Sequence, residues 1–289
     1  ISFMLEAENA PLFNRTLMGT YAPGSTFKPC TAIAALTMGI VNTEDKIKCE
    51  GVYTRYAAEG YAPECWIWNS TKDHLTHPEE IAAIHQAYAD AGAEFISTNA
   101  FGANGLKFDG RDGRPSLHAV IRAAVHCAKE ARDTARGGQK NRFVALDIGP
   151  LGRMLEPLGD LPFEAAVELF AEIVRIGTAE GADFVLIETM NDAYETKAAV
   201  LAAKENTDLP IFVSNVYDEN AKLMTGATPE AMAALLEGLR VDVMGINCSL
   251  GPDQMLKLLP RLAACTSLPL LVKPNAGMPH SRSGRTVYD

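Results

Sequence analysis

The sequence predicts an α/β fold with a parallel sheet from residue 76 onward, and three observations carry this prediction. Six short apolar runs alternate with amphipathic stretches of helical length. Two expected helices are followed by Ala91-Gly92-Ala93 or Glu180-Gly181-Ala182-Asp183, where glycine is suited to end a helix just before a strand. Polar residues close the apolar runs. Strands that alternate with helices form right-handed units, and their parallel sheet is buried on both faces.

The first helix is expected to begin with Thr76 as its N-cap, with Pro78 and two glutamates in its first turn. Its apolar residues recur at helical spacing until Gly92. Further helices are expected over residues 163–178, 192–204, 229–239 and 252–264. The six strands are expected over residues 94–101, 143–149, 183–189, 210–216, 241–248 and 269–274.

Polar residues lie at the C-terminal ends of the expected strands. They are Asn99, Asp147, Glu188, Asn215, Asn247 with Cys248, and Asn275. In a parallel α/β barrel the functional residues lie at this rim. A single such residue can equally cap a helix or satisfy a loop, but six at one rim favour a functional site. Periodicity alone leaves a barrel and a doubly wound open sheet as alternatives.

Composition and charge exclude several classes of protein. The 289 residues, of which 47% are hydrophobic, suffice for one large domain or two smaller ones with a sizeable core. A net charge of -10 argues against a nucleic-acid-binding surface. The longest apolar stretch, residues 30–41, is too short to be a membrane segment. Six scattered cysteines without a CxxC pair indicate a reducing compartment, so a cytoplasmic location is expected.

Several short sequence motifs after residue 75 occur together in one known family. They are His77-Pro78-Glu79, Thr98-Asn99-Ala100-Phe101, Asp147-Ile148-Gly149-Pro150, Ile187-Glu188-Thr189-Met190, Gly245-Ile246-Asn247-Cys248-Ser249 and Pro274-Asn275-Ala276-Gly277. In this order they resemble the homocysteine-binding barrel of cobalamin-dependent methionine synthases, over residues 75–289. The resemblance implies an eight-stranded (β/α)8 TIM-type barrel that acts as a homocysteine S-methyltransferase. Methyl transfer would then go to the thiolate of homocysteine, the small-molecule substrate, bound to zinc.

The resemblance also assigns roles to three residues. Cys248 matches one of three cysteines that hold zinc, which deprotonates a substrate thiol near neutral pH. Glu188 matches the acid that pairs with the substrate ammonium, and Asn247 is assigned to the same substrate site. A lone cysteine such as Cys248 can instead be a small buried apolar residue. Glu188 can instead be an acid at the N-terminus of the next helix.

The chain departs from this pattern at both ends, which are expected to be truncated. No counterpart of the first barrel strand precedes Thr76, and the chain ends at Asp289, in an expected loop, before the eighth strand with its two zinc cysteines. Cys127 lies in a helical stretch and Cys265 is expected at the opposite end of the barrel, so neither replaces them. We therefore expect six of eight strands, an incomplete zinc site and impaired activity. Cobalamin and methyltetrahydrofolate would act through modules absent from this chain.

The first 72 residues carry a different pattern. The segment from Tyr21 to Pro29, which contains Ser25 and Lys28, resembles the start of a penicillin-binding protein transpeptidase domain. Ser-x-x-Lys at a helix start lets the amine take the hydroxyl proton as serine attacks an acyl carbonyl. An acyl-serine transpeptidase fragment of peptidoglycan synthesis, with Ser25 and Lys28 catalytic, is thus the alternative function.

The domain prediction is therefore a small α+β transpeptidase-like fragment over residues 1–72, followed by the barrel over residues 75–289. Two families joined near residues 69–75 indicate a fused or mis-joined coding sequence rather than an evolved two-domain enzyme. The transpeptidase piece lacks credible counterparts of its other active-site elements, so Ser25 is expected to be inert. A partial barrel that binds nothing is a third, non-enzymatic interpretation.

Overall fold

The computed structural model describes residue 75 and residues 78–111, 115–136, 142–275, 279–282 and 285–288. The chain divides into two compact units, one of Ile1–Asn69 with Pro279–Asp289 and one of Ser70–Met278. The predicted transpeptidase-like fragment, with Ser25 and Lys28, lies outside the described residues, and so does the predicted N-cap Thr76.

The larger unit is built from a parallel sheet and helices in alternation. Its strands are β1 Phe95–Ser97, β2 Phe143–Ile148, β3 Phe184–Met190, β4 Ile211–Asn215, β5 Val243–Asn247 and β6 Leu270–Lys273. Its helices are α5 Pro78–Asp90, α6 Leu117–Thr134, α7 Phe163–Ala179, α8 Ala193–Asn206, α9 Pro229–Gly238 and α10 Pro252–Ala263. Every predicted strand is present, and the predicted helices agree with the observed ones to within two residues at each end.

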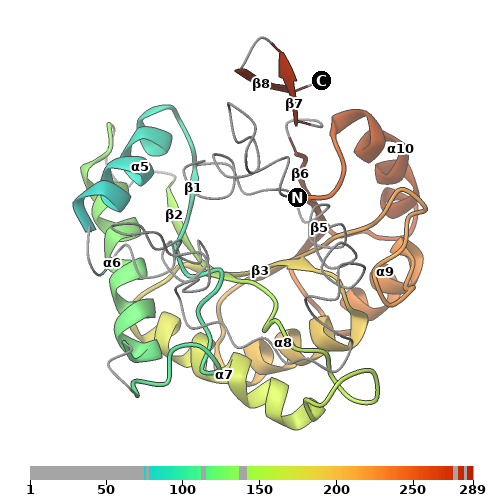
Figure 1. Ribbon diagram of the computed structural model, residues 1–289, viewed down its shortest axis with the longest axis horizontal. Helices are drawn as coiled ribbons and strands as arrows, with labels where there is room; N and C mark the ends of the chain where they lie inside the picture. The colour runs from blue at the N-terminus through green and yellow to red at the C-terminus, as the bar shows by residue number, and fades with distance from the viewer. Residues whose placement is uncertain are drawn as a thin grey trace, which may run out of the picture. The chain divides into compact units, whose positions relative to one another are not determined.

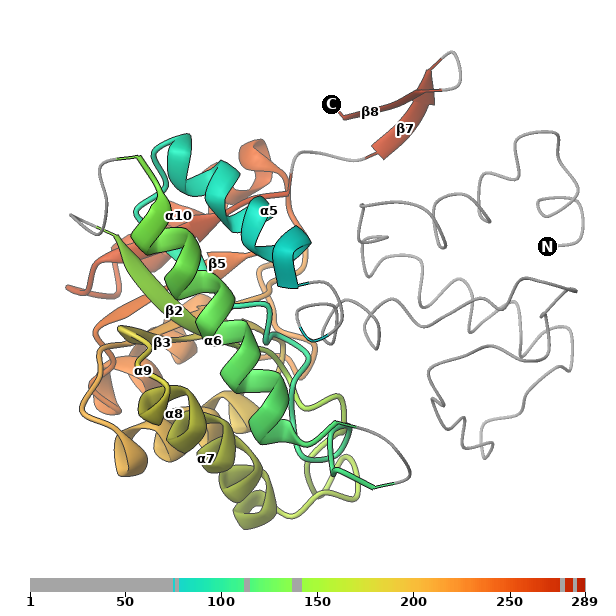
Figure 2. The ribbon, with the colours of Figure 1, turned by 90° about the vertical axis from the view of Figure 1, so that its left-hand side faces the viewer.

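The strand order identifies the fold as part of a barrel. All six strands are parallel and pair in sequence order, from β1 to β6. Figure 1 shows the sheet curved into an arc, with helices α5 to α10 around its outer side. Figure 2 shows α5 beside α6 and α7 beside α8 along this outer layer. A doubly wound sheet would reverse its strand order and carry helices on both faces. The predicted six-stranded, incomplete barrel is confirmed.

The two faces of the sheet differ in composition. The outward face packs on the helices through fully buried residues such as Leu146, Ile187 and Val213. The inward face forms a second cluster of Ala145, Phe184 and Leu186, against which Phe212 and Leu271 pack. Because side chains alternate along a strand, this assignment fixes the direction of every later residue of the sheet.

Two strands are each preceded by an aspartate that holds the N-terminal end of the adjacent strand in the sheet. The Asp183 carboxylate accepts a hydrogen bond from the Val144 amide at 2.7 Å, and the Asp183 amide donates to the Val144 carbonyl at 2.9 Å. Asp242 makes the same pair of bonds with Ile211, at 2.8 and 2.9 Å. Arg132 of α6 also pairs with Asp183 at 3.1 Å. These reciprocal bonds set the register of β2 with β3 and of β4 with β5.

Two local expectations differ from the structure. The first strand ends at Ser97 rather than residue 101, because the Ala100 amide turns back to the Thr98 carbonyl at 2.8 Å. The expected loop at the end of the chain is wrong: Pro279–Arg282 and Arg285–Tyr288 pair as an antiparallel hairpin, β7 and β8. Among the described helices, none combines the length and apolar character needed to cross a bilayer.

The contact between β5 and β6 yields a prediction about Gly245. A β-carbon at this position would overlap the Leu271 carbonyl of β6, whereas one at Gly238, at the end of α9, would meet nothing within 4 Å. Gly245→Ala should therefore lower the free energy of unfolding by about 1–3 kcal/mol, as over-packing does. Gly238→Ala, the matched control, should leave stability unchanged or slightly raised. Urea denaturation of the two variants measures the difference, and equal stabilities would contradict the close approach.

Candidate functional site

The inward faces of four strands end in polar side chains. Asp147 follows Ala145 on β2, Glu188 follows Leu186 on β3, Asn247 follows Gly245 on β5 and Lys273 follows Leu271 on β6, each two residues later. Residues two apart on a strand share a face, so all four side chains turn toward the barrel interior. The C-terminal rim therefore carries two acids, an amide and a lysine.

Glu188 and Lys273 form an ion pair across this interior. The ammonium of Lys273 donates to Oε2 of Glu188. Strands β4 and β5 lie between β3 and β6 in the sheet, so the pair spans the concave side of the arc. The Glu188 side chain is 13% exposed and that of Lys273 is 42% exposed. The carboxylate is thus largely desolvated, while the lysine still reaches solvent.

Asn247 ties three strand ends together. Its Oδ1 accepts hydrogen bonds from the Thr189 amide at 3.0 Å and from the Ser214 hydroxyl at 2.9 Å. Its Nδ2 donates to Oγ1 of Thr189 at 2.7 Å and to Sγ of Cys248 at 3.4 Å. Both polar atoms of its amide are hydrogen-bonded within the protein, so Asn247 stabilises the arrangement of the strand ends at the rim.

Cys248 lies at the point where β5 leaves the sheet. Its backbone is left-handed, with φ of 57°, and Thr189 beside it has φ of 63°. Non-glycine residues rarely adopt this conformation, and such residues concentrate at functional sites. The Cys248 amide donates to the Lys273 carbonyl at 3.1 Å, and its thiol lies 4.0 Å from the Thr189 hydroxyl. Burial raises the pKa of this thiol, and the nearby Glu188 carboxylate adds to the effect.

Asp147 is buried at the same rim. The residue is 6% exposed, and within the described part of the chain its Oδ1 has no hydrogen-bond partner. Burial raises the pKa of this carboxyl well above its usual value, the Glu188 charge raises it further, and the Lys273 charge opposes both. Two acids that share one low-dielectric site cannot both ionise readily. Both effects make the Asp147 carboxyl harder to ionise than an exposed aspartate.

The other sequence-predicted rim residues do not all join this group. Asn215 turns outward, where its amide donates to the Met190 carbonyl and to the Thr196 hydroxyl, both at 3.2 Å. Its prediction as part of the functional rim is wrong, because Ser214 occupies the inward position. Asn99 and Asn275 are half-buried in the loops after β1 and β6.

The remaining described cysteines lie where the sequence predicted. Cys127 is buried in α6, and Cys265 is exposed after α10, before β6 begins. Within the described ranges, no group of three or more histidine, cysteine, aspartate or glutamate side chains is arranged to hold a metal ion. In that part of the chain Cys248 is therefore the sole cysteine at the C-terminal rim.

Sequence reasoning missed Lys273, Thr189 and Ser214 as members of the site. The signal for Lys273 was present, since Leu270-Leu271-Val272-Lys273 is an apolar strand closed by a charged residue at an inward position. Thr189 and Ser214 gave no such signal. Their roles come from hydrogen bonds to Asn247, a residue 58 and 33 positions away in the sequence.

Known proteins share both the sequence pattern and this fold. The model of the family described as "Homocysteine S-methyltransferase" matches residues 51–289, most of the chain. The chain belongs to the homocysteine S-methyltransferase family. A second family model, "Penicillin binding protein transpeptidase domain", matches residues 2–76. The expected resemblances on both sides of residue 72 thus recur in these matches.

Relatives of this homocysteine S-methyltransferase family member include two mycobacterial methionine synthases. That of Mycobacterium leprae is 30% identical over 209 residues, which are 71% of this chain and 17% of the relative. That of Mycobacterium tuberculosis is 29% identical over the same shares. The chain therefore spans about a sixth of the length of these relatives. The metallated form of the homocysteine methyltransferase MmuM from Escherichia coli superimposes with a TM-score of 0.65 at 26% identity, covering 77% of this chain and 79% of that one.

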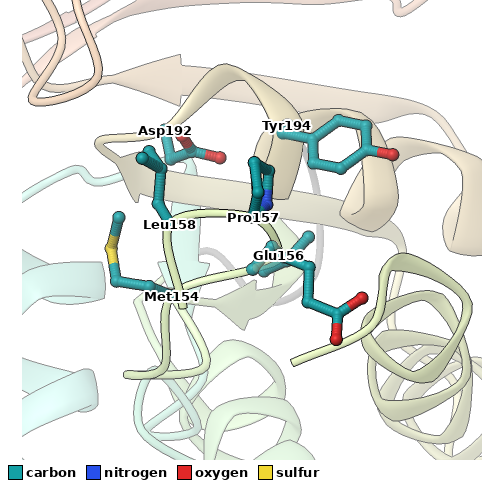
Figure 3. Close-up of a pocket in the computed structure, with 7 residues that line it drawn as sticks. Met154, Glu156, Pro157, Leu158, Asp192 and Tyr194 are labelled. Atoms are coloured by element: carbon teal, nitrogen blue, oxygen red, sulfur yellow. The ribbon is translucent and has the colours of Figure 1, made fainter. Parts of the chain in front are cut away.

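A small cavity lies beside the loop after β2, apart from the polar rim. Its volume is about 200 Å³, and Figure 3 shows most of its lining. The lining residues are Met154, Leu155, Glu156, Pro157, Leu158, Asp192 and Tyr194. Glu195 of α8 holds this loop, because its Oε1 accepts a hydrogen bond from the Leu151 amide at 2.8 Å. None of the four inward rim residues lines this cavity, so it is not the strand-end site.

The buried Glu195 predicts a pH dependence of stability. Burial raises its pKa from 4.5 to about 7, opposed by the Leu151 hydrogen bond and supported by the Asp192 charge. Between these two pH values the folded state binds the proton that the unfolded state has released. Stability should therefore fall as pH rises through this window, with roughly 3 kcal/mol from Glu195.

Glu195→Gln tests this assignment, because the amide keeps the shape and does not titrate. Urea denaturation at several pH values should show a shallower loss of stability in Glu195→Gln than in the unmodified protein. Glu205→Gln, at an exposed position of the same helix, should keep the full slope. Identical slopes in all three proteins would show that Glu195 is ionised at an ordinary pKa.

Proposed function

We propose that residues 75–289 form the homocysteine-binding module of a homocysteine S-methyltransferase. The observation that carries this proposal is the convergence of Glu188, Asn247 and Cys248 at one strand-end rim of a chain in this family. Parallel α/β barrels place their functional residues at this rim. The methionine synthases among the relatives and the homocysteine methyltransferase fold of the solved structure support the same substrate.

Within this function Glu188 would bind the ammonium group of homocysteine. Its carboxylate is held inward and largely desolvated, which strengthens a charge-assisted hydrogen bond. Asn247 would act on the substrate through its neighbours, since it fixes Thr189 beside the Cys248 thiol. The rim residues thus divide into one that binds the substrate and one that positions its surroundings.

Cys248 suits a zinc ligand in chemistry but does not complete a site. A thiol at the end of a strand, which accepts a hydrogen bond from the Asn247 amide and lies beside the Thr189 hydroxyl, is a normal ligand for zinc. A catalytic zinc site has three protein ligands and an open fourth position, and the described residues include no group of three or more histidine, cysteine, aspartate or glutamate side chains that could hold the ion. Bound zinc would supply the deprotonation of the substrate thiol.

The remaining parts of the proposal concern the wider protein. Residues 1–72 and 75–289 would come from two families, and cobalamin and methyltetrahydrofolate would be bound by modules other than this one. The three described cysteines are free thiols, which is consistent with a reducing compartment such as the cytoplasm. The alternative function, an acyl-serine transpeptidase acting through Ser25 and Lys28, is favoured by the family match to residues 2–76.

Substrate binding by Glu188 tests the proposed function directly. Glu188→Gln should weaken the binding of L-homocysteine about tenfold or more, because a buried charged hydrogen bond is lost. Glu205→Gln, on the exposed surface of α8, should bind like the unmodified protein. Isothermal titration under reducing conditions gives both affinities. Absence of homocysteine binding, together with fluorescent penicillin labelling that disappears in Ser25→Ala, would favour the transpeptidase instead.

Zinc affinity tests the role of Cys248. We expect weak, sub-stoichiometric zinc, because one thiolate of three is in place. Cys248→Ser should abolish this binding, whereas Cys265→Ser, which removes an exposed thiol outside the rim, should not change it. Competition with a chromophoric chelator measures the affinity. Zinc bound equally well by the Cys248→Ser protein would exclude Cys248 as a ligand.

A further inference from the structure

Lys273 occupies a position that packing alone does not explain. Its side chain follows Leu271 on the inward face of β6 and reaches across two intervening strands to Glu188. The desolvation of a charge is costly, and a partly buried ion pair often gives little net stability over an apolar pair. A pair at a functional rim is therefore better explained by what it binds than by what it holds together.

A second observation indicates that a ligand completes this rim. Asp147 is buried on the same inward face, and its Oδ1 has no hydrogen-bond partner among the described residues. Buried polar atoms are almost always paired, so such an atom calls for a partner. A ligand group with N–H donors, located between Glu188 and Asp147, would satisfy this oxygen.

We propose that Glu188 and Lys273 together recognise the zwitterionic head of an α-amino acid, the acid taking the ammonium and the lysine taking the carboxylate. The inference rests on the proposed function for the class of ligand, and adds Lys273 as the residue that selects an α-carboxylate. In the free protein the two side chains neutralise each other. A zwitterion replaces each partner with a group of the same charge, so its binding leaves the net charge of the rim unchanged.

The position of Lys273 relative to Cys248 agrees with a short amino acid that ends in sulfur. Asn247, the residue before Cys248, is paired with Lys273 in the β5–β6 ladder, and the Cys248 amide donates to the Lys273 carbonyl at 3.1 Å. The carboxylate partner and the thiol thus lie on adjoining backbone segments. A ligand held at its head by Glu188 and Lys273 can direct a short side chain toward Cys248.

The lysine has a different role if it merely neutralises Glu188. In that case Lys273 competes with the ligand ammonium, and its removal tightens the binding of every ammonium compound. If Lys273 binds the carboxylate, removal of the lysine weakens the binding of only those ligands that carry a carboxylate. The two roles therefore predict opposite effects on a zwitterionic ligand.

Three stable thioethers distinguish these roles by isothermal titration to the full chain. L-methionine carries both charges, 3-(methylthio)propylamine lacks the carboxylate, and 4-(methylthio)butanoate lacks the ammonium. Lys273→Met should weaken the binding of L-methionine about tenfold or more, as expected for a lost charged hydrogen bond. The same variant should bind the amine as well as the unmodified protein does, or more tightly.

Two further variants serve as controls. Lys273→Arg should retain the affinity for L-methionine, because a guanidinium also binds carboxylates. Lys204→Met, which removes an exposed lysine of α8, should change none of the three affinities. If a loss of fold causes the weakening in Lys273→Met, the affinity for the amine will fall as well, and thermal unfolding will show the change.

Failure of the inference can be told from failure of the proposed function. Suppose that Glu188→Gln weakens the binding of L-methionine while Lys273→Met leaves that binding unchanged or tightens it. The carboxylate role of Lys273 is then overturned, and the amino acid site stands. If the unmodified protein binds neither L-methionine nor L-homocysteine, both the proposed function and this inference are overturned.

Discussion

The two-residue alternation of each strand is the constraint on which the rest of the structure depends. One face must fit the helices and the other must fill a barrel interior, so every inward position is fixed once one of them is known. Along this interior the composition changes from end to end. Phe95, Phe184 and Phe212 form the floor, with ring centroids 4.5–6.0 Å apart. Aliphatic and small residues follow, and polar side chains end the strands. The polar rim is thus the end of an otherwise apolar inward face of the sheet.

This alternation also decides what the sequence could predict. The helices and strands were predictable, because periodicity, glycine caps and polar strand ends are local signals. The barrel was not distinguishable from a doubly wound sheet, since strand order is a property of contacts between distant segments. Asn215 was assigned to the rim because it ends a strand, but a shift of one residue reverses a side chain. Ser214 therefore faces the site, and Asn215 faces the helices.

The charge balance of the rim follows from burial rather than from the number of acids. Asp147 and Glu188 face one lysine, and full ionisation of both acids would leave an excess negative charge in a partly desolvated site. Burial and the Glu188 charge raise the pKa of Asp147, which favours its neutral form. The ion pair with Lys273 offsets the charge of Glu188. This balance could not be predicted from sequence, because the two partners are 85 residues apart.

The close pairing of β5 with β6 joins the two halves of the proposed site. Gly245 has no side chain, so the Leu271 carbonyl can approach its backbone closely. The same ladder pairs Asn247 with Lys273, and the left-handed turn at Cys248 brings its amide back to the Lys273 carbonyl. A thiol and a lysine from separate strands are thereby held by backbone bonds rather than by side-chain contacts alone. Because the β5–β6 pairing positions both residues, a change in its register would disturb the sulfur end and the carboxylate end of a bound amino acid together.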